Sequence, residues 1–341
     1  MPLRMLVLSL TGNCNLACRY CYASAQDPHM MTWETAHRAI DLAAAGGTPF
    51  ILQFSGGEPL LAFPLLRRIA DYICTNRIRA RMDLQTNGTL LTEGMADFLH
   101  HADIGIGISL DGRPDVHDVY RCYPDGRGSS MDVITGIQCL GRRGIAVGLT
   151  CVVTAENVGR LSGLIEMAYY LGNVRRIGFD LLRTQGRGTA VRPAREEEMA
   201  QAMAEVFVRN EHLGRLHGYR IVIAQEEQGR GLAERSDSGF SHCYAMNGAG
   251  AHIDAAGRIY ACSSFVGDAR FLLGDVEHGI DVRRQEELAH EMQGAMAFCR
   301  ACADFSACGG ACYARRAGQE YSAASDAECA LKRAAIKAAG V

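Results

Sequence analysis

The chain has 341 residues, of which 48% are hydrophobic and 21% are charged, and its formal net charge at pH 7 is −3. This balance allows a sizeable buried core, but it gives no electrostatic case for binding nucleic acid or an anionic membrane surface. No run approaches the roughly 18 apolar residues of a membrane helix, and the opening segment MPLRMLVLSL is too short for a signal peptide. We therefore expect a cytoplasmic protein with neither nucleic acid nor membrane among its partners.

Apolar β-type runs alternate with amphipathic helical patterns over the first two-thirds of the chain. The runs predict strands near residues 3–10, 50–54, 81–85, 104–110, 145–153 and 176–182. The amphipathic patterns predict helices near residues 33–45, 60–76, 92–101, 131–143, 157–171 and 195–210. Six strand–helix units in strict alternation imply parallel strands with right-handed crossovers. Because a closed barrel of this kind needs eight units, the expected α/β fold is a partial (β/α)6 barrel, open on one side, with a doubly wound sheet as the alternative.

The composition changes in the last third of the chain. Residues 214–240 contain the charged stretch AQEEQGRGLAERSDSG and are predicted to be a bridging segment. From residue 241 onward the sequence is rich in glycine and cysteine and has few long periodic stretches, which predicts a small domain organised around metals. The expected units are a barrel over residues 1–213, the bridge, and a second domain over residues 241–341.

The closing segment SDAECALKRAAIKAAG predicts a C-terminal helix. Ser325 and Glu328 fit a capping box, in which each residue would satisfy a free backbone amide of the first turn. This cap would place Cys329 in the first turn of the helix.

The 14 cysteines are too many for ordinary packing in a cytosolic protein, and no export signal argues for disulfides. Three of them, the first cysteines, lie on the loop after the first predicted strand: Cys14, Cys18 and Cys21. Seven more fall between Cys243 and Cys329 at ligand-like spacings. The remaining four are predicted to be buried packing residues: Cys74, Cys122, Cys139 and Cys151. Two groups of closely spaced thiols indicate metal or iron–sulfur sites.

The first cysteines have the spacing C-x3-C-x2-C, and neither a fourth cysteine nor a histidine lies nearby. Structural zinc normally takes four ligands, so zinc would be left incomplete. A [4Fe–4S] cluster held by three thiolates keeps one iron open for another ligand. The loop follows a strand, so it lies at the edge of the sheet where α/β folds place their sites.

With Tyr20 directly before Cys21, this segment resembles the signature of the radical SAM superfamily. The resemblance implies that the open iron binds the amino and carboxylate groups of S-adenosylmethionine. One electron then cleaves the cofactor, and a 5′-deoxyadenosyl radical abstracts hydrogen from the substrate.

Further motifs follow the resemblance at the ends of later predicted strands. QFSGGEP implies that Gly56, Gly57 and Glu58 contact the methionyl amine, although the same residues also suit a strand-to-helix turn. ISLDG and the arginine downstream of it imply that Ser109 and Arg121 contact the cofactor, with the guanidinium on the methionyl carboxylate. At the end of the sixth strand, the resemblance suggests Leu182 for packing on the adenine.

The C-terminal cysteines resemble the SPASM extension of this superfamily, which holds two auxiliary [4Fe–4S] clusters, so three clusters are implied in all. By that resemblance, four outer cysteines ligate one cluster: Cys299, Cys302, Cys308 and Cys329. Three inner cysteines ligate the other: Cys243, Cys262 and Cys312. A zinc ribbon remains the alternative for CRACADFSACGGAC taken alone. The inner cluster would keep an open iron, or borrow a ligand from His242, His252 or a distant cysteine.

SPASM-type enzymes mainly modify peptides and proteins, so we expect a maturase that forms a thioether or carbon–carbon crosslink in a ribosomally made peptide. The alternative is an anaerobic sulfatase maturase, which forms formylglycine from Cys or Ser. Those enzymes usually carry Asp where this chain has Ser263, directly after Cys262. Other SPASM chemistry, such as small-molecule dehydrogenation, and a non-catalytic iron–sulfur electron carrier are further alternatives. The cofactor motifs argue against a carrier.

The expected partners are a peptide or protein substrate and a reductant such as flavodoxin or ferredoxin. The first cysteines come so early that we expect no leader-peptide-binding domain before them, so that either a separate recognition protein or the barrel itself would recognise the substrate. The sequence offers four aspartates as candidate proton acceptors: Asp111, Asp180, Asp254 and Asp268. The histidines form no H-x-x-E-H or H-E-x-x-H pattern, so a hydrolytic metal site is unsupported.

Overall fold

The computed structural model describes residues 2–24, 26–235, 239–240, 242–316 and 323–341. Its centre is a sheet in which the six predicted strands pair in chain order and in parallel. They are β1 (Met5–Ser9), β2 (Phe50–Ser55), β3 (Ala80–Thr86), β4 (Gly105–Ser109), β5 (Val147–Val153) and β6 (Val174–Leu181). The first strand does not pair with the sixth, so the sheet is open and the predicted partial barrel is confirmed.

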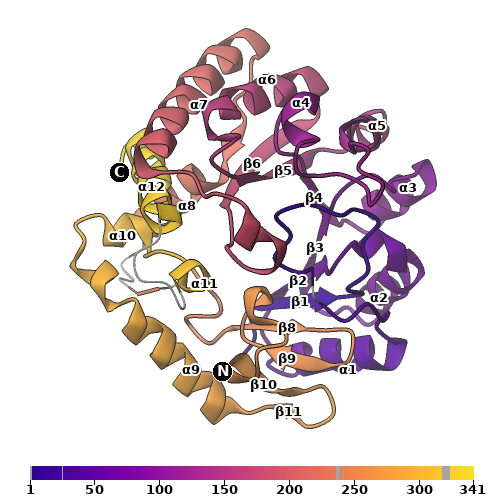
Figure 1. Ribbon diagram of the computed structural model, residues 1–341. Helices are drawn as coiled ribbons and strands as arrows, with labels where there is room; N and C mark the ends of the chain where they lie inside the picture. The colour runs from indigo at the N-terminus through magenta and orange to yellow at the C-terminus, as the bar shows by residue number, and fades with distance from the viewer. Residues whose placement is uncertain (1, 25, 236–238, 241, 317–322) are drawn as a thin grey trace.

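Helices cover the outer face of this sheet (Figure 1). They are α1 (Trp33–Ala44), α2 (Phe63–Thr75), α3 (Glu93–His101), α4 (Pro114–His117), α5 (Ser130–Gly141), α6 (Leu161–Leu171) and α7 (Glu196–His217). Capping threonines begin two of them, because Thr32 accepts the amide of Thr35 and Thr92 accepts that of Met95. All six predicted helices are present, and α7 continues beyond its predicted end.

Strand alternation separates an apolar outer face from a polar inner face. On β2, Phe50, Leu52 and Phe54 are buried beneath the helices, whereas Gln53 between them is only half-buried. A polar row crosses the inner face of the later strands. There the Gln85 amide donates to Ser109 Oγ (3.2 Å), and Thr150 Oγ1 donates to Gln85 Oε1 (3.3 Å). The concave side of the barrel therefore presents hydrogen-bonding groups to whatever enters it.

The C-terminal third extends the same sheet. Next to β1 lie β8 (Gly250–Ile253), which pairs in parallel, and then the antiparallel strands β9 (Arg258–Tyr260), β10 (Leu272–Asp275) and β11 (Gly279–Ile280). At the other edge, the two-residue strand β7 (Val222–Ile223) pairs with β6. Residues on both sides of position 240 thus share one sheet, and the domain boundaries stay predictions.

Five more helices complete the chain: α8 (Ala224–Ala233), α9 (Val282–Ala295), α10 (Phe305–Cys308), α11 (Tyr313–Arg316) and α12 (Ala323–Ala339). The last of these packs against α7 and α8, so the C-terminal segment crosses from β11 to the far side of the open barrel (Figure 1). The sequence did not predict α8 or α9. Two glycines, Gly229 and Gly231, lower the helix propensity of α8, and its packing against α12 is a tertiary contact that the sequence does not show.

The predicted capping box is wrong. Helix α12 begins at Ala323, before Ser325. The Glu328 carboxylate instead accepts the backbone amide of Cys312, at 3.0 and 3.2 Å. This contact joins the helix to the cysteine-rich loop, which a local motif cannot reveal.

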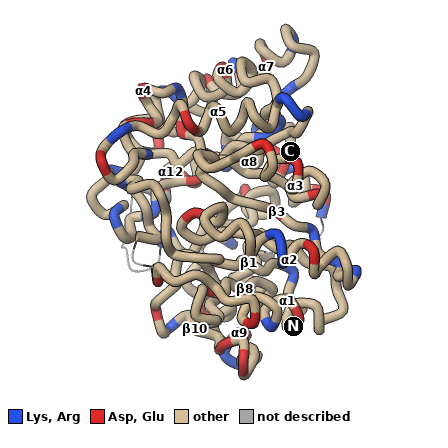
Figure 2. Tube along the Cα trace, turned by 90° about the vertical axis from the view of Figure 1, so that its right-hand side faces the viewer, with Lys and Arg blue, Asp and Glu red and all other residues tan. Residues whose placement is uncertain are grey.

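Charge is distributed without a dominant sign on the face shown in Figure 2, where basic and acidic positions are interspersed along the trace. Within the described part of the chain, no helix is long and apolar enough to cross a membrane.

Candidate active site

The loop that follows β2 holds the loop that carries the first cysteines. The Gly57 amide donates to Thr11 O (2.7 Å), and the Glu58 amide donates to Asn13 O (2.8 Å). A β-carbon on Gly57 would lie 2.2 Å from Asn13 O, and one on Gly56, whose φ is +128°, would lie 2.3 Å from Thr11 O. Only glycine permits this approach. In the structure, these glycines therefore contact the cysteine loop itself.

Gly57→Ala is expected to displace the cysteine loop and destabilise the fold by about 1–3 kcal/mol, because backbone atoms on both sides cannot yield cheaply. Gly94→Ala is the matched control, since a β-carbon there meets nothing within 4 Å on helix α3. That change should be neutral or stabilising by about 0.5–1 kcal/mol. Denaturant unfolding and iron content after anaerobic reconstitution measure both effects. Equal behaviour of the two variants would contradict the close contact.

The Glu58 carboxylate is fully buried and holds the neighbouring loop. Its oxygens accept hydrogen bonds from Thr86 Oγ1 (2.7 Å), the Asn87 amide (2.7 Å) and the Leu60 amide (3.0 Å). Burial raises the pKa of Glu58, and these three hydrogen bonds act against the rise. In the structure the Glu58 carboxylate therefore binds groups of the protein itself, and its contact with a methionyl amine stays a prediction.

Sequence reasoning missed the part played by Asn87. Its side-chain amide donates to Asn15 Oδ1 (2.9 Å) and lies 3.8 Å from Cys14 Sγ. An Asn-Gly pair is an ordinary turn former, and the one signal that could have marked Asn87 is its place directly after the end of β3.

The first cysteines lie together on a loop that is tied to the segment after α4. The Ala17 amide donates to Cys122 O (2.7 Å), and the Arg19 amide donates to Tyr120 O (2.8 Å). Burial raises the pKa of Cys18 to about 12, with Arg121 acting against the rise and the other two first cysteines adding to it. Burial also raises the pKa of Cys14. The three first cysteines therefore lie close enough together to interact electrostatically.

Three predicted site residues form one buried cluster. Arg121 Nε donates to Asp111 Oδ2 (3.0 Å), and the Tyr20 hydroxyl donates to the same oxygen. The Arg121 guanidinium also lies 5.2 Å from the centre of the Tyr20 ring. The other Asp111 oxygen accepts the Val152 amide (2.9 Å). Arg121 thus already has a carboxylate partner, and Asp111, a candidate base, is buried and hydrogen-bonded at both oxygens.

His117 supports this cluster in one defined protonation state. Its Nδ1 accepts the Asp111 amide (3.3 Å), while Nε2 lies 3.1 Å from Ser129 Oγ, which itself donates to Arg121 O (2.8 Å). The ring must then be neutral with its proton on Nε2. Burial lowers the pKa of His117 to about 4.

Since the unfolded pKa is near 6.5, this group contributes stability above pH 6.5 that is lost as the pH falls toward 4. We expect the free energy of unfolding to fall by roughly 2 kcal/mol between pH 6.5 and 5 from this group alone. Thermal unfolding across this range should show a shallower slope in His117→Asn. An unchanged slope would contradict the neutral assignment.

Two remaining cofactor residues lie near the first cysteines or on the inner face. Leu182 is buried with Tyr20 and Val191, and Cys18 packs against this small cluster. Ser109 lies on the inner face as the acceptor from Gln85. The structure therefore brings the leucine to the cysteine loop and leaves the serine in the polar row.

The other candidate bases are paired as well. Asp254 is buried and accepts two amides of its own turn and Arg258 Nε (2.7 Å). Asp268 pairs with Arg270. Asp180, half-buried at the end of β6, pairs with Arg183 (2.8 Å) and with a second arginine from α11. None of the four candidate bases is without a hydrogen-bond partner.

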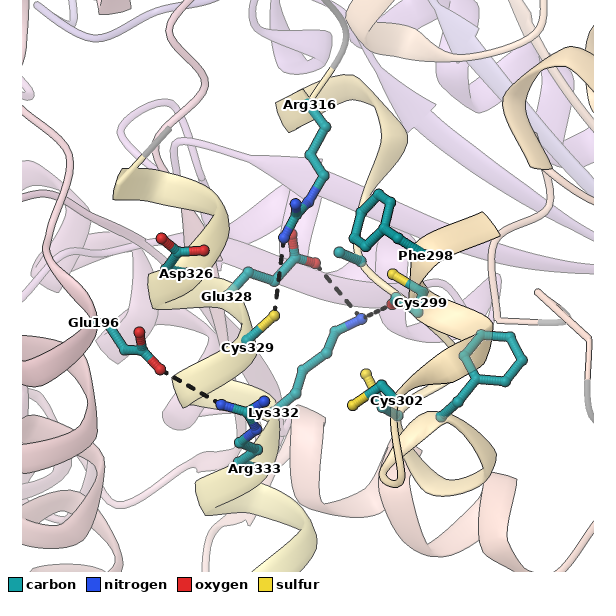
Figure 3. A pocket seen from close by; sticks show the side chains of 14 residues that line it. Glu196, Phe298, Cys299, Cys302, Arg316, Asp326, Glu328, Cys329, Lys332 and Arg333 are labelled. Carbon is teal, nitrogen blue, oxygen red and sulfur yellow. Dashed lines mark hydrogen bonds and ion pairs between the residues drawn. The ribbon is translucent and has the colours of Figure 1, made fainter. Parts of the chain in front are cut away.

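The outer cysteines line a cavity of about 270 Å³. Figure 3 shows Cys299, Cys302 and Cys329 around it, with Lys332 reaching in from α12. Arg316 Nη2 lies 3.9 Å from Cys329 Sγ. The lining also holds three cationic side chains and three carboxylates: Arg316, Lys332, Arg333, Glu196, Asp326 and Glu328. Cations beside the thiols suit a group that carries negative charge on its thiolates.

The inner cysteines also gather in space, although they come from three separate segments. Burial raises the pKa of Cys243 to about 12, and the Cys312 and Cys262 thiols raise it further. Burial and the Cys312 thiol likewise raise the pKa of Cys262. The fold thus brings together the three thiols that the sequence assigned to one cluster.

Among the described residues, neither histidine suggested as a borrowed ligand makes a hydrogen bond to an inner cysteine. His252 Nδ1 lies 3.0 Å from Ser263 Oγ, and its Nε2 is buried with no partner among the described residues. Burial lowers the pKa of His242 to about 3, and its charged neighbours are Lys332 and Glu328. The fourth inner ligand stays open.

Among the described residues, no three His, Cys, Asp or Glu side chains converge closely enough to hold a single metal ion. The outer thiols instead line one cavity, and thiols within the first group and within the inner group affect one another's pKa. A cluster of several iron atoms needs wider spacing than one ion, so these donor sets fit iron–sulfur clusters better than zinc.

Comparisons with known proteins identify the family of the chain. Residues 8–168 match the model of the radical SAM superfamily. The chain is 33% identical over 267 residues to the uncharacterized protein MJ0907 of Methanocaldococcus jannaschii, covering 78% of this chain and 86% of that protein. It is 30% identical over 325 residues to the mycofactocin maturase MftC of Mycobacterium ulcerans, covering 91% of this chain and 83% of that protein.

A solved structure extends the likeness to the whole fold. The structure of anSMEcpe with bound AdoMet and the Cp18Cys peptide has a TM-score of 0.80, with 100% of this chain and 97% of that chain covered. Identity is 21%, so this match concerns the fold. The cysteine loop, the open parallel barrel and the two sequence relatives all point to one family. The chain belongs to the radical SAM superfamily, whose enzymes use S-adenosylmethionine and a [4Fe–4S] cluster, and within it to the SPASM-type maturases.

Proposed function

We propose that this enzyme oxidatively modifies a peptide, forming a thioether or other crosslink in a ribosomally made precursor. One observation carries the proposal. The loop after β6 contacts both segments: the Arg187 amide donates to Cys21 O (3.0 Å), and the Gln185 side chain donates to Ala314 O (3.5 Å), two residues after Cys312, so one loop joins the segments of the first and the inner cysteines. A substrate in the open interior would lie between the two groups.

The first cysteines would hold the cluster to which S-adenosylmethionine binds. When bound, that cluster supplies the electron that cleaves the cofactor and yields a 5′-deoxyadenosyl radical. The chain's own residues position the loop: Gly57 and the Glu58 amide fix its backbone, and Tyr20 packs behind it with Leu182. Ser109 and Gln85 offer hydrogen bonds on the inner face.

The C-terminal segment would hold two further clusters, one on the inner and one on the outer cysteines, so residues 241–341 act as a SPASM unit. The thiol-lined cavity and the gathering of three thiols from distant segments support this assignment. The fit of these donor sets to iron–sulfur supports it too.

A peptide substrate is supported by the unclosed sheet, whose half-buried polar face can accept an extended segment. The anSMEcpe structure with a bound peptide and the maturase MftC support it as well. A reductant such as flavodoxin or ferredoxin would supply electrons, and a separate leader-binding protein could present the precursor. The free state of all the cysteines suits a reducing compartment, so we place the enzyme in the cytoplasm.

The test is high-resolution mass spectrometry after anaerobic incubation with reductant, S-adenosylmethionine and a short peptide encoded beside the gene. Loss of two hydrogens, with fragments showing a crosslink, is the expected result. A Cys-containing sulfatase-type peptide is the parallel substrate. Formylglycine on it, with no change in the neighbour peptide, would overturn the proposal in favour of a sulfatase maturase.

A further inference from the structure

A charged network lies between the end of β6 and the inner cysteines. Asp180 at the strand end binds Arg183 Nη1 (2.8 Å) and also accepts Arg315 Nη2. Arg315 Nη1 continues to Glu328 Oε1 (3.1 Å), and Glu328 accepts the Cys312 amide. The network therefore joins the barrel strand to the backbone of one inner cysteine.

Arg315 is joined to an inner cysteine by hydrogen bonds, because its amide donates to Cys312 O (3.2 Å) and its guanidinium binds the Glu328 carboxylate that accepts the Cys312 amide. Arg183 lowers the pKa of the Cys262 thiol, against burial and the Cys312 thiol, which raise it. Burial lowers the pKa of both arginines, but Asp180 raises that of each, Glu328 raises that of Arg315, and the Cys312 thiol adds a smaller rise to both, so the pKa of each arginine is raised overall. Arg183 also stacks over Tyr22, with 4.7 Å from Cζ to the ring centre.

Each of these two arginines has one N–H donor that makes no hydrogen bond to the described residues. Within the described residues, the Nε–H groups of Arg183 and Arg315 are buried and have no hydrogen-bond partner. The Arg315 side chain is only 10% exposed, so water does not replace a partner. Buried donors beside thiols are the groups that hydrogen-bond to cluster sulfur.

We propose that Arg183 and Arg315 form a guanidinium clamp, held by Asp180, that sets the reduction potential of the group on the inner cysteines. The inference rests on the proposed function, because it needs a cluster there. On reduction the cluster takes up one electron from the reductant, and no bond forms or breaks. Positive charge and N–H donors stabilise the more negative reduced state, so the clamp raises the potential. Asp180, a carboxylate in the same network, partly offsets this effect.

The parent for the test is the full chain carrying Cys14→Ala, Cys18→Ala and Cys21→Ala, so that only the C-terminal groups remain. After anaerobic reconstitution, EPR-monitored titration with dithionite gives the midpoint potential of each group. Arg183→Met should move the inner midpoint to lower potential, whereas Asp180→Asn should move it to higher potential. The outer midpoint should stay fixed in both, as an internal reference.

Arg215→Met is the matched control, because this arginine is 77% exposed on α7 and pairs with Glu211, away from every cysteine group. It should leave both midpoints unchanged. If Arg183→Met loses iron, Asp180→Asn and Arg183→Lys decide the matter, the lysine variant keeping the charge and shifting the midpoint less.

Different results would overturn the cluster assignment and the guanidinium clamp. A parent that binds no iron–sulfur at the C-terminal cysteines overturns the cluster assignment and the clamp together. A parent with both groups in place, but with inner midpoints that stay fixed or move in the same direction for Arg183→Met and Asp180→Asn, overturns the clamp alone. A purely structural role would not produce opposite shifts.

Discussion

Cys18→Ala is expected to reduce 5′-deoxyadenosine formation by more than about 100-fold, because losing a direct ligand should exceed the 10–100-fold typical of outer-shell partners. Cys18 is half-buried between the other two first cysteines and near Arg121. Its removal leaves two thiols, too few to hold a cluster with one open iron. Reverse-phase chromatography of the nucleoside products, under reductant and without peptide, measures the effect.

Cys74→Ala is the matched control. The prediction that this thiol is buried is wrong, because it lies exposed on α2, on the outer side of the barrel. Product formation should stay within a factor of two of the parent, given the small effects usual at exposed positions. If Cys18→Ala retained activity close to that of this control, the first cysteines would not be the site of cofactor cleavage.

Arg121→Met is expected to lower the free energy of unfolding by about 3–5 kcal/mol, since it strands the buried Asp111 carboxylate without a counter-charge. Asp111 Oδ2 would keep only the Tyr20 hydroxyl. Denaturant midpoints of the parent and the variant, compared at equal iron content, give the loss.

A double-mutant cycle separates this role from cofactor binding. Asp111→Asn combined with Arg121→Met should recover part of the loss, because both charges are removed together. The sequence resemblance instead assigned Arg121 to the methionyl carboxylate. A variant of unchanged stability, but with a raised KM for S-adenosylmethionine, would favour that assignment over the ion pair.

The strand–helix alternation could be predicted because each strand has an apolar outer face and each helix an apolar stripe. Both features produce periodic patterns among residues that are close together in the sequence. The first cysteines were readable for a similar reason, since all three ligands lie on one loop. Three thiols at that spacing have few functions other than binding a metal or an iron–sulfur cluster.

What the sequence could not reveal depends on tertiary contacts. Glu328 looked like a helix cap, but its carboxylate reaches a backbone amide 16 positions away in the chain. Gly56 and Gly57 suggested approach to a ligand, whereas their α-carbons pack against the cysteine loop. Asp111 and Arg121 were assigned separate roles ten residues apart, yet the fold pairs them. The type of a charged or small residue indicates which groups it can bind, but its actual partner depends on the tertiary fold.

The most direct measurement is iron and acid-labile sulfide per chain with Mössbauer spectra, after anaerobic reconstitution of the parent and of variants lacking the first, inner or outer cysteines. Three clusters predict about twelve iron atoms in the parent and about eight in each variant, all as [4Fe–4S]. A parent with about four iron atoms, all lost with the first cysteines, would contradict the claim that the C-terminal cysteines hold two more clusters.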